Sequence, residues 1–410
     1  MGLALHDIRV VEVAQVAAVP MAGRHLADFG AEVIHVEPKS TGDSWRAFEP
    51  GKNAINMCTG ANGYINYNWE NFNRNKKSIG LDISTDLGYH ILTRLLSNAD
   101  IFLTNLRIFE RKKYNLEYEI LHAQFPKLIY GSLTGYGKEG TETNSPAYDS
   151  ISWWARSGMG YLFSTPGVPP FIDGGAIGDS AAGFGLALGI MTALFVRERT
   201  GIGQEVDLSL LHTGIYQLSY YLSGSFSSKK DYREWGTLSR EDTLNPLILP
   251  YETQDGRWLL LAMPQSDRYW AKFCQVIGRI DLVGDGRFSS FLVRAENHKV
   301  LFQIIKDVFL SKPLSHWKTK LTNVIPYSPY QNFLEVINDP QARINDVFVP
   351  SEHPTHGTIE VIDNPIRLSE TPATIRTPAP EFGQNTEEVL LENGYSWDDI
   401  QKFKNEGVIN

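Results

Sequence analysis

The sequence predicts an α/β protein with a large doubly wound, mostly parallel (Rossmann-like) domain and a smaller α+β domain. Three observations predict this class. Patterns typical of strands and helices alternate along the first 135 residues. A segment rich in glycine, proline and aromatic residues then interrupts the alternation, and further strand and helix patterns follow a polar stretch. Strands separated by helices of about ten to fifteen residues are typical of a parallel sheet.

The large domain is expected to begin with alternating strands and helices. Pro20 opens its first helix and Gly30 closes it, because proline suits the first turn of a helix and glycine suits its end. The expected order is strand 8–13 (IRVVEV), helix 20–30 (PMAGRHLADFG), strand 31–38 (AEVIHVEP), strand KSIGLDI, helix TDLGYHILTRLLSNA, strand DIFLTN, a short helix near 116–123 and strand 127–134 (KLIYGSLT).

The second half of the chain is expected to complete the large domain and to hold the small one. Residues 135–178 are expected to form a long loop, and an apolar helix is expected over 179–198. The segment LILPYETQDGRWLLLAMP predicts two strands joined by an Asp-Gly turn. The expected division is a large domain over 1–220 completed by 335–410, a linker over 221–244 and a small α+β domain over 245–334.

Composition and charge exclude several classes of partner. The net charge of −9 argues against nucleic acid, because binding to phosphate backbones needs a basic face. Cys58 and Cys274 are too far apart to suggest a disulfide framework or a zinc site. The N-terminus lacks the charged and then apolar build of a signal peptide, which favours a cytoplasmic protein. The apolar run 181–196 is shorter than the roughly 20 residues that span a bilayer, and predicts a buried helix without a membrane role.

Two motifs are rejected on their context. GYGKEG (135–140) matches a dinucleotide-binding fingerprint and follows a strand, but the turn-like TETNSPAYDS comes next where a helix is required. The first βα turn, VAQVAAVP, lacks glycines, which argues against a nicotinamide or flavin site. HPTH (353–356) has a proline between its histidines and predicts an exposed turn, so no metal site is expected.

One carboxylate, Asp179 in GGAIGDSAAGFG, has two interpretations. An aspartate at the start of a helix commonly caps its free amides, and an apolar helix follows this one. The glycines at 174, 175 and 178 instead leave room for a ligand beside the carboxylate. From the residues alone both interpretations stay open.

Two basic clusters lie beside expected strands. NRNKKS precedes the strand 78–83, and LRIFERKK follows the strand 100–104. Such clusters are usually solvated surface, but open α/β sheets bind ligands near the loop ends. A ligand that carries phosphate would suit them in an otherwise acidic protein.

Several segments together resemble one known family. They occur in family order as RVVEVAQVAAVPMAGRHLADFGAEVIHVEPKSTGDSWR, NRNKKSIGLDI, DIFLTNLR, PKLIYGSLTGYGKEG, PAYDSISWWARSG, GDSAAGFGLALGIMTALFVRERTGIGQEVDLSL and NTEEVLLENGYS. Taken together these stretches resemble the family III CoA-transferases (the CaiB/BaiF family), which include formyl-CoA transferase and the crotonobetainyl/carnitine CoA-transferases. The resemblance covers most of the chain, and the combination is specific although no single segment is.

The resemblance implies a reaction and a set of site residues. Asp179 would be the nucleophile that attacks an acyl-CoA and carries CoA as an aspartyl thioester, with Tyr148 as a second catalytic residue. No permanent cofactor and no metal are expected, since a CoA thioester is the substrate and a carboxylic acid the acceptor. An interlocked homodimer is implied as well. The positions expected to contact CoA are Gln15, Val16, Ala18, Lys39, Lys76, Asn105, Leu106 and Lys113.

Departures from the family pattern bear on the acceptor acid. Ala17 stands where formyl-CoA transferase has a glutamine near the reacting acyl group, and Pro38 replaces a basic residue, with Lys39 next to it. The glycine-rich loop of formyl-CoA transferase has no clear counterpart in SSKKDYREWGTLSRED. These departures disfavour formate and oxalate.

The aromatic segments 64–72 and 153–163 have two interpretations. They pack the core or a dimer interface, or they line a pocket for a hydrophobic or aromatic acid. The second interpretation, together with Ala17, predicts a hydrophobic or aromatic acceptor such as an arylalkyl or branched dicarboxylic acid.

Two other functions stay open. An α-methylacyl-CoA racemase would pair the aspartate with a histidine, but this chain has Tyr148 at that position, and a phenol that ionises near about pH 10 is a poor acid/base partner. A CoA-binding partner subunit without chemistry is the other alternative, and the presence of Asp179 counts against it.

Overall fold

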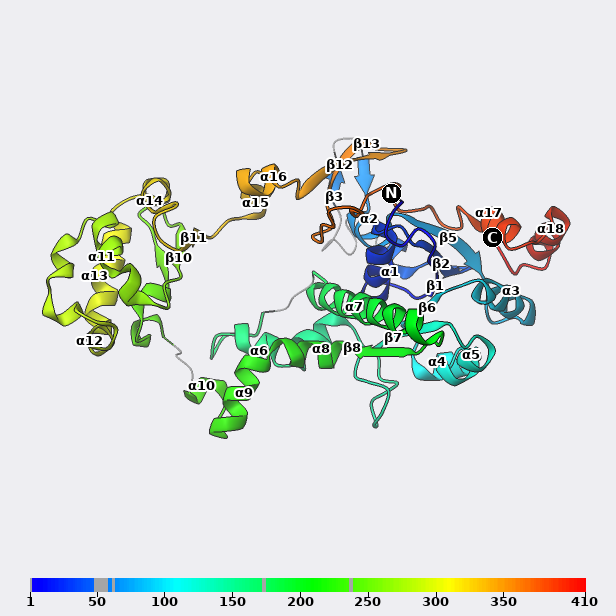
Figure 1. Ribbon diagram of the computed structural model, residues 1–410, viewed down its shortest axis with the longest axis horizontal. Coiled ribbons are helices and arrows are strands. Elements are labelled where there is room, and N and C mark those ends of the chain that lie inside the picture. Colours follow the sequence, from blue (N-terminus) through cyan, green and yellow to red (C-terminus); the bar gives the residue numbers. More distant parts are fainter. Residues whose placement is uncertain (1, 48–57, 61–62, 172–174, 236–238) are drawn as a thin grey trace. The chain divides into compact units, whose positions relative to one another are not determined.

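The computed structural model describes residues 2–47, 58–60, 63–171, 175–235 and 239–410 (Figure 1). The chain divides into two compact units, of which the first combines Met1–Ser219 with Ile344–Asn410 and the second is Tyr220–Arg343. The return to the first unit comes later than the expected residue 335. The segment expected as a linker over 221–244 contains α10 (Tyr232–Trp235) and most of α9 (Ser219–Ser228), and it lies in the second unit.

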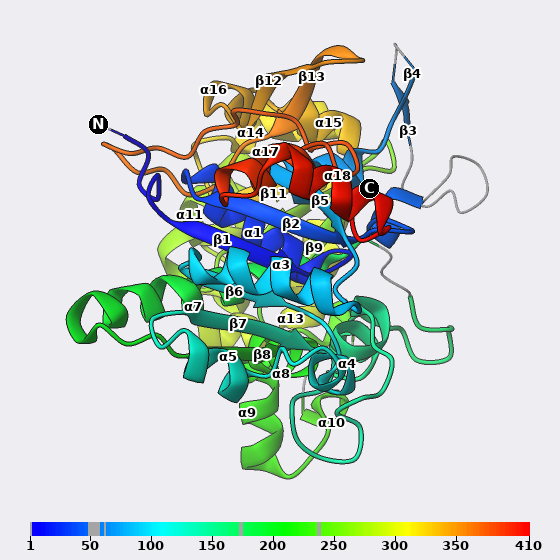
Figure 2. The ribbon, with the colours of Figure 1, turned by 90° about the vertical axis from the view of Figure 1, so that its right-hand side faces the viewer.

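The first unit is built on a six-stranded sheet in the order β5-β2-β1-β6-β7-β8, in which every pairing is parallel (Figure 2). The expected mixed α/β class with a mostly parallel sheet is therefore confirmed. The chain winds outward from β1 through β2 to β5, and then from β6 in the other direction. The reversal lies between β1 and β6. The strands are β1 (Arg9–Val13), β2 (Glu32–Pro38), β5 (Lys76–Leu81), β6 (Ile101–Thr104), β7 (Ile129–Thr134) and β8 (Glu205–Ser209).

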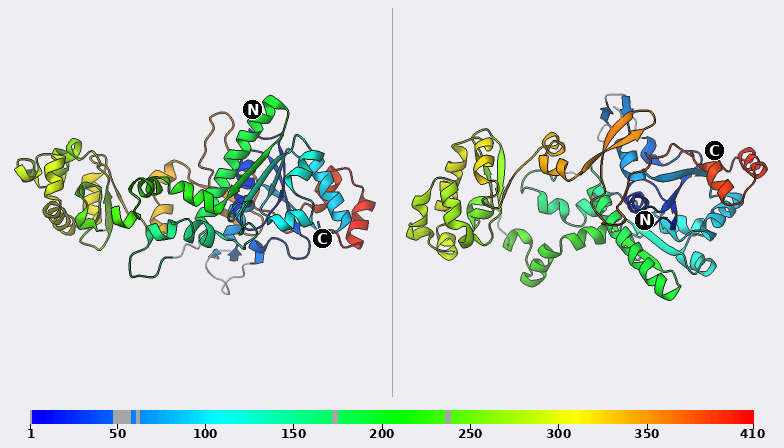
Figure 3. Two further views of the ribbon diagram at one scale, coloured as in Figure 1. Left: turned by 90° about the horizontal axis from the view of Figure 1, so that it is seen from below. Right: turned by 45° about the horizontal axis from the view of Figure 1, so that its top comes forward.

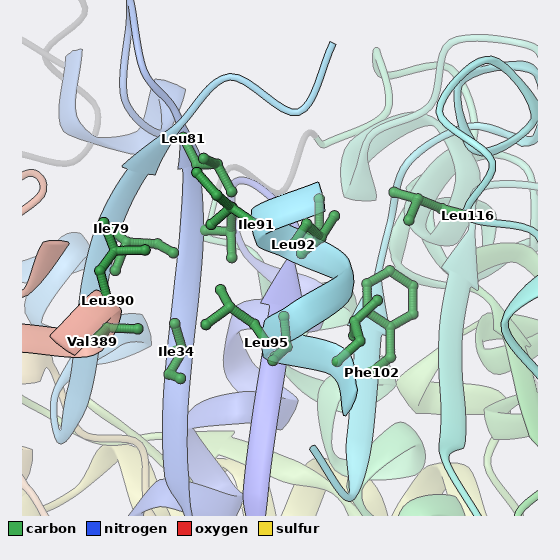
Figure 4. Packing of buried hydrophobic residues seen from close by; sticks show 14 of the residues in the cluster. Ile34, Ile79, Leu81, Ile91, Leu92, Leu95, Phe102, Leu116, Val389 and Leu390 are labelled. Carbon is green, nitrogen blue, oxygen red and sulfur yellow. The ribbon is translucent and has the colours of Figure 1, made fainter. Parts of the chain in front are cut away.

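One face of the sheet holds a large apolar core. α3 (Asp86–Ser97) contributes Ile91, Leu92 and Leu95, which pack over Ile34 of β2 and Phe102 of β6 (Figure 4). The helices α17 (Thr386–Glu392) and α18 (Trp397–Asn405) pack into the same core, beside α3 in both views of Figure 3. The end of the chain therefore forms part of this unit.

The other face is covered by α1 (Ala18–Asp28) and α7 (Ile177–Thr200), which pack closely together. Glycine makes the close approach possible, because a Cβ at Gly183 would lie 2.7 Å from Cβ of Met21. The apolar run 181–196 was expected to be buried, but only one face of α7 is covered. Phe184, Leu188 and Phe195 remain exposed on it. Within the described residues, α7 is also the one helix long and apolar enough to cross a bilayer.

The connections of the first unit carry short elements. They are a 3-10 turn η1 (Ser44–Ala47), β3 (Cys58–Gly60), β4 (Gly63–Ile65), α2 (Tyr67–Asn73), α4 (Ile108–Lys113), α5 (Tyr118–Gln124), a π-helical segment (Ser150–Ala155), α6 (Met159–Phe163), α8 (Leu210–Gln217), β12 (Phe348–His353) and β13 (Gly357–Ile362). The HPTH segment lies at the turn between β12 and β13.

The second unit has a three-stranded antiparallel sheet in the order β11-β10-β9. Its turn between β9 and β10 contains the expected Asp255-Gly256 pair, with Gly256 at φ +70°. A core that includes Phe273, Phe309 and Trp317 joins the sheet to its helices. The elements are β9 (Pro250–Glu252), β10 (Trp258–Leu261), α11 (Ser266–Val276), α12 (Phe291–Glu296), α13 (His298–Leu310), α14 (Leu314–Leu321), β11 (Tyr327–Pro329), α15 (Phe333–Ile337) and α16 (Pro340–Ile344).

Candidate active site

A pocket of about 410 Å³ opens where the order of strands reverses, beyond the carboxyl ends of β1 and β6. This is the place where doubly wound sheets bind ligands, because loops leave neighbouring strands there in opposite directions. Seven residues expected at the site from the sequence line this pocket, namely Gln15, Val16, Ala18, Asn105, Leu106, Tyr148 and Asp179.

The turn after β1 is held from two sides. The side chain of Asn105 accepts a hydrogen bond from the amide of Gln15 at 3.1 Å and donates one to its carbonyl oxygen at 2.7 Å. The amide of Val16 donates to both carboxylate oxygens of Asp43, each at 3.1 Å. The carboxamide of Asn105 thus fixes the backbone of the turn that edges the pocket.

The turn leads directly into the N-terminus of α1. No side chain caps this helix at Ala17, and both Ala17 and Ala18 line the pocket. The free amides of a first helical turn carry partial positive charge, which favours an anionic group in front of them. Behind the pocket wall, Ala17 packs against Trp45 and Phe72 in a small apolar cluster.

Asp179 is the third residue of α7 and not its N-cap, which corrects one of the two interpretations from the sequence. The N-cap is Ala176, in the left-handed region at φ +56°, and it makes no side-chain capping bond. The buried carboxylate of Asp149 instead accepts from the amide of Gly178 at 3.2 Å. Asp179 is half-buried and forms part of the lining of the pocket.

Gly178 explains why this helix begins with small residues. A Cβ at that position would lie 2.3 Å from Oδ1 of Asp149 and 2.3 Å from ring carbons of Trp153. Trp153 is buried and its indole donates to Gln217 at 2.7 Å. The first turn of α7 is therefore in tight contact with the segment that follows Tyr148. Sequence reasoning missed Asp149, whose only signal was its place in the AYD motif.

Tyr148 reaches the pocket from the end of a long loop. Its side chain is 65% exposed. The loop begins at Gly135, where a Cβ would lie 2.0 Å from Cβ of Ala147, so the two ends of the loop touch. No helix begins after GYGKEG within this fully described loop, as the sequence predicts.

A second pocket of about 360 Å³ adjoins the first, since Gln15, Leu106 and Glu110 line both. Lys39 lines this second pocket. Lys113 lines neither pocket, but its ammonium lies 3.5 Å from the hydroxyl of Tyr114, which lines the second. Of the lysines and arginines in the two basic clusters, only Arg107 lines the first pocket, where it pairs with Glu110 at 3.2 Å.

Lys76 is placed differently from its expected role at CoA. Its side chain is wholly buried, and the ammonium donates to Glu12 at 2.7 Å, to the carbonyl of Pro20 at 2.9 Å and to Asn73 at 3.0 Å. It lines neither of the two connected pockets. These contacts occupy the ammonium inside the protein and leave it no approach to a ligand in either pocket.

The aromatic segments pack mainly against protein. Trp69 and Phe72 belong to the cluster behind Ala17, and Trp153 and Trp154 are buried. Among the described side chains of 64–72 and 153–163, none lines the pocket that contains Asp179. The side chain of Tyr64 lies outside the described part. Among the described residues there is also no group of three or more His, Cys, Asp or Glu placed to hold a metal ion.

Comparisons with known proteins give one consistent result. The family described as CoA-transferase family III matches residues 5–386. The (R)-2-hydroxy-4-methylpentanoate CoA-transferase of Clostridioides difficile is 32% identical over 406 residues, which are 99% of each chain. The cinnamoyl-CoA:phenyllactate CoA-transferase of Clostridium sporogenes is 32% identical over 400 residues, 97% of this chain and 95% of that protein. A solved CaiB/BaiF family protein from Brucella suis has a TM-score of 0.80 and 25% identity, over 96% of this chain and all of that one.

Proposed function

The chain belongs to CoA-transferase family III, and from this we propose that it moves CoA from an acyl-CoA to a hydrophobic 2-hydroxy acid through a thioester on Asp179. The observation that carries the proposal is the pocket at the strand reversal, whose lining combines Asp179 and Tyr148 with the turn after β1. A carboxylate acts as nucleophile without a general base, which fits the absence of a histidine from the residues that line this pocket.

The proposed reaction consists of four exchanges at carbonyl carbon. The carboxylate of Asp179 attacks the thioester carbonyl, the C–S bond breaks, and a mixed anhydride and CoA thiolate form. The thiolate attacks the aspartyl carbonyl and expels the first acid. The acceptor carboxylate then attacks the aspartyl thioester and releases the thiolate again, which finally attacks the acceptor carbonyl and frees Asp179. No net proton is taken up or lost, and each step replaces one acyl bond by another.

We place CoA across the two connected pockets. Gln15, Leu106 and Glu110 lie between them, so a ligand that fills both would pass over the turn after β1. The thiol end would lie toward Asp179, and Lys39 would face the phosphates. The amides at the start of α1 would stabilise the oxyanion that forms in each attack, because preorganised N–H donors act most strongly in a site of low dielectric. Lys76 is left out of this contact set because its ammonium is enclosed.

The acceptor proposal rests on relatives and on the pocket wall. The two relatives described above are named for (R)-2-hydroxy-4-methylpentanoate and phenyllactate, both of which are 2-hydroxy acids with an apolar side chain. Ala17, backed by Trp45 and Phe72, presents an apolar wall where a glutamine would offer hydrogen bonds. We therefore narrow the hydrophobic or aromatic acids considered from the sequence to those with a 2-hydroxyl group, which include an arylalkyl acid, and leave out the branched dicarboxylic acids.

Trapping tests the nucleophile. Incubation with an acyl-CoA and hydroxylamine is expected to convert Asp179 to a hydroxamate, which is read from the mass of the peptide that contains it. Asp179→Ala is expected to lose both the adduct and the transfer activity. Glu198→Gln, in the last turns of the same helix, serves as the matched control and should keep both. Transfer by Asp179→Ala at the wild-type rate would end the assignment.

An acceptor panel tests the substrate class. The acids are (R)-2-hydroxy-4-methylpentanoate, phenyllactate, glutarate and formate, each with the same acyl-CoA donor and with product masses as the readout. The two hydrophobic 2-hydroxy acids are expected to react fastest. Faster transfer to glutarate or formate would refute the acceptor proposal and leave the CoA-transferase class unchanged.

We also propose that a second copy of the chain covers the exposed face of α7, as the family resemblance implies. This face exposes the apolar side chains of Phe184, Leu188 and Phe195 to solvent, and exposed apolar patches commonly mark protein–protein interfaces. Light scattering at micromolar concentration is expected to give the mass of a dimer for the wild type and a lower mass for Leu188→Asp. A wild-type monomer would refute the dimer.

A further inference from the structure

A chain of buried charges runs beneath the candidate active site. The carboxylate of Glu12 on β1 lies 2.7 Å from the ammonium of Lys76 and 2.6 Å from Nδ1 of His35. Nε2 of His35 lies 3.3 Å from Oδ2 of Asp43. The side chains of Glu12, His35, Asp43 and Lys76 are all fully covered by protein.

His35 carries a positive charge in this chain. Burial by itself lowers the pKa of its imidazole, but the contacts with Asp43 and Glu12, and the charges of Glu12 and Glu37, raise it to about 9. The ring is therefore an imidazolium at neutral pH, placed between two carboxylates. Lys76 supplies the second positive charge, at Glu12. The ring lies beside the carboxylate of Asp43, and both side chains are fully buried.

Asp43 uses its carboxylate to hold the pocket wall. Its two oxygens accept from the amide of Val16, and Oδ1 also accepts from the amide of Trp45 at 2.8 Å. Glu37 in turn accepts from the amide of Asp43 at 2.8 Å, which fixes the loop after β2. Hydrogen bonds therefore hold both the backbone of Asp43 and its carboxylate in place.

Val16 needs such support because its backbone is strained. It adopts φ +69°, in the left-handed region, where a β-branched side chain is a rare outlier. The neighbouring positions are the N-cap and the first residue of α1, and both line the pocket. A relaxation of Val16 to an ordinary φ would move Ala17 and Ala18 from their place in the lining that also contains Asp179.

We propose that Asp43, whose carboxylate lies 3.3 Å from Nε2 of the buried His35, is a positioning residue that holds Val16 in its left-handed conformation and so sets the wall of the pocket formed by Ala17 and Ala18. The effect on catalysis rests on the proposed function, since this wall is the one placed against the reacting acyl group. His35 and Asp43 touch no substrate in this scheme. They act through the backbone of Val16.

Coupling between Asp43 and Val16 tests the proposal. Glycine adopts a positive φ at no steric cost, so Val16→Gly removes the need for the clamp. Asp43→Ala is expected to lower kcat by about tenfold in the Val16 protein, and by less than about threefold in the Val16→Gly protein. Asp28→Ala is the matched control, because Asp28 is equally buried but contacts Arg74 and Asn75 instead. Its effect on kcat should be the same in both backgrounds.

A measurement without substrate separates this inference from the proposed function. Hydrogen exchange of the peptide that spans residues 14–20, followed by mass spectrometry, is expected to speed up in Asp43→Ala and in His35→Gln. An inactive wild-type protein would refute the proposed function and leave this readout intact. Equal effects of Asp43→Ala in the two backgrounds, or unchanged exchange, would overturn the positioning role. If Asp43→Ala is insoluble, the protein that carries both Asp43→Ala and Val16→Gly is expected to be soluble. Insolubility of both variants would also overturn the proposal.

Discussion

Glu70 on α2 makes stability depend on pH in a direction unusual for a carboxylate. The residue is 7% exposed. Its Oε2 accepts from the amide of Ala379 at 2.9 Å, and Oε1 lies 3.4 Å from Nε2 of His353. Burial raises its pKa and the charge of Glu381 adds to this, which together outweigh the hydrogen bond from Ala379 and bring the pKa from 4.5 to about 7.

The size of the effect follows from the two pKa values. The folded protein binds this proton more tightly than the unfolded chain, so protonation favours the fold. The stabilisation is complete below pH 4.5, the value for the free side chain, and is lost as pH rises through about 7. At 1.36 kcal/mol for each pH unit, the difference between 4.5 and about 7 corresponds to about 3 kcal/mol.

Glu70→Gln removes this dependence, because the amide keeps an acceptor for Ala379 and has no proton to lose. Urea denaturation is expected to show the variant more stable than wild type at pH 8 by about 2–3 kcal/mol, and nearly equal to it at pH 4. Glu32→Gln is the control, since Lys77 and Arg9 overcome burial and lower the pKa of Glu32. That variant should lose stability at pH 8. A difference between Glu70→Gln and wild type that is the same at both pH values would refute the reasoning.

Three further outcomes are expected. Gly178→Ala pushes Asp149 and Trp153 away from α7, so kcat should fall by at least about tenfold and the free energy of unfolding by about 1–3 kcal/mol. Gly284→Ala is the control and should change neither, because a Cβ at Gly284 would meet no other atom. Lys76→Met leaves Glu12 buried without its ammonium partner and should cost about 3–5 kcal/mol in thermal unfolding, with an unchanged KM for acyl-CoA in the folded fraction. The raised pKa of His35 stabilises the protein fully below pH 6.5, and this contribution of about 3 kcal/mol should disappear as pH rises to 9, with a flatter profile in His35→Gln.

Strands β1, β2 and β7 could be predicted because each lies in a segment rich in apolar, β-branched residues, although Glu12 and His35 interrupt the first two. The segments 8–13, 31–38 and 127–134 contain these three strands. A parallel sheet buried on both faces requires such runs, so composition alone reveals them. The pocket residues in the turns after β1 and β6 followed from the family resemblance, and the parallel sheet brings those two turns together.

The parts that could not be predicted depend on contacts between distant residues. Lys76 and Lys77 are neighbours in one basic cluster, yet alternation along β5 turns the first into the core and the second toward Glu392. Asp149 caps α7 from a position 29 residues earlier in the chain, beyond the reach of any local capping rule. The composition of α7 indicates an apolar helix but does not tell which of its faces the rest of the chain covers.

The length of α7 has a consequence for activity in dilute solution. The helix has 24 residues and so extends for roughly 36 Å, with the carboxylate of Asp179 in its first turn and the uncovered apolar side chains along the turns that follow. If a second copy of the chain covers that surface, dissociation removes this support from the helix that carries Asp179. The rate per subunit should then fall on dilution below the dissociation constant and recover on concentration.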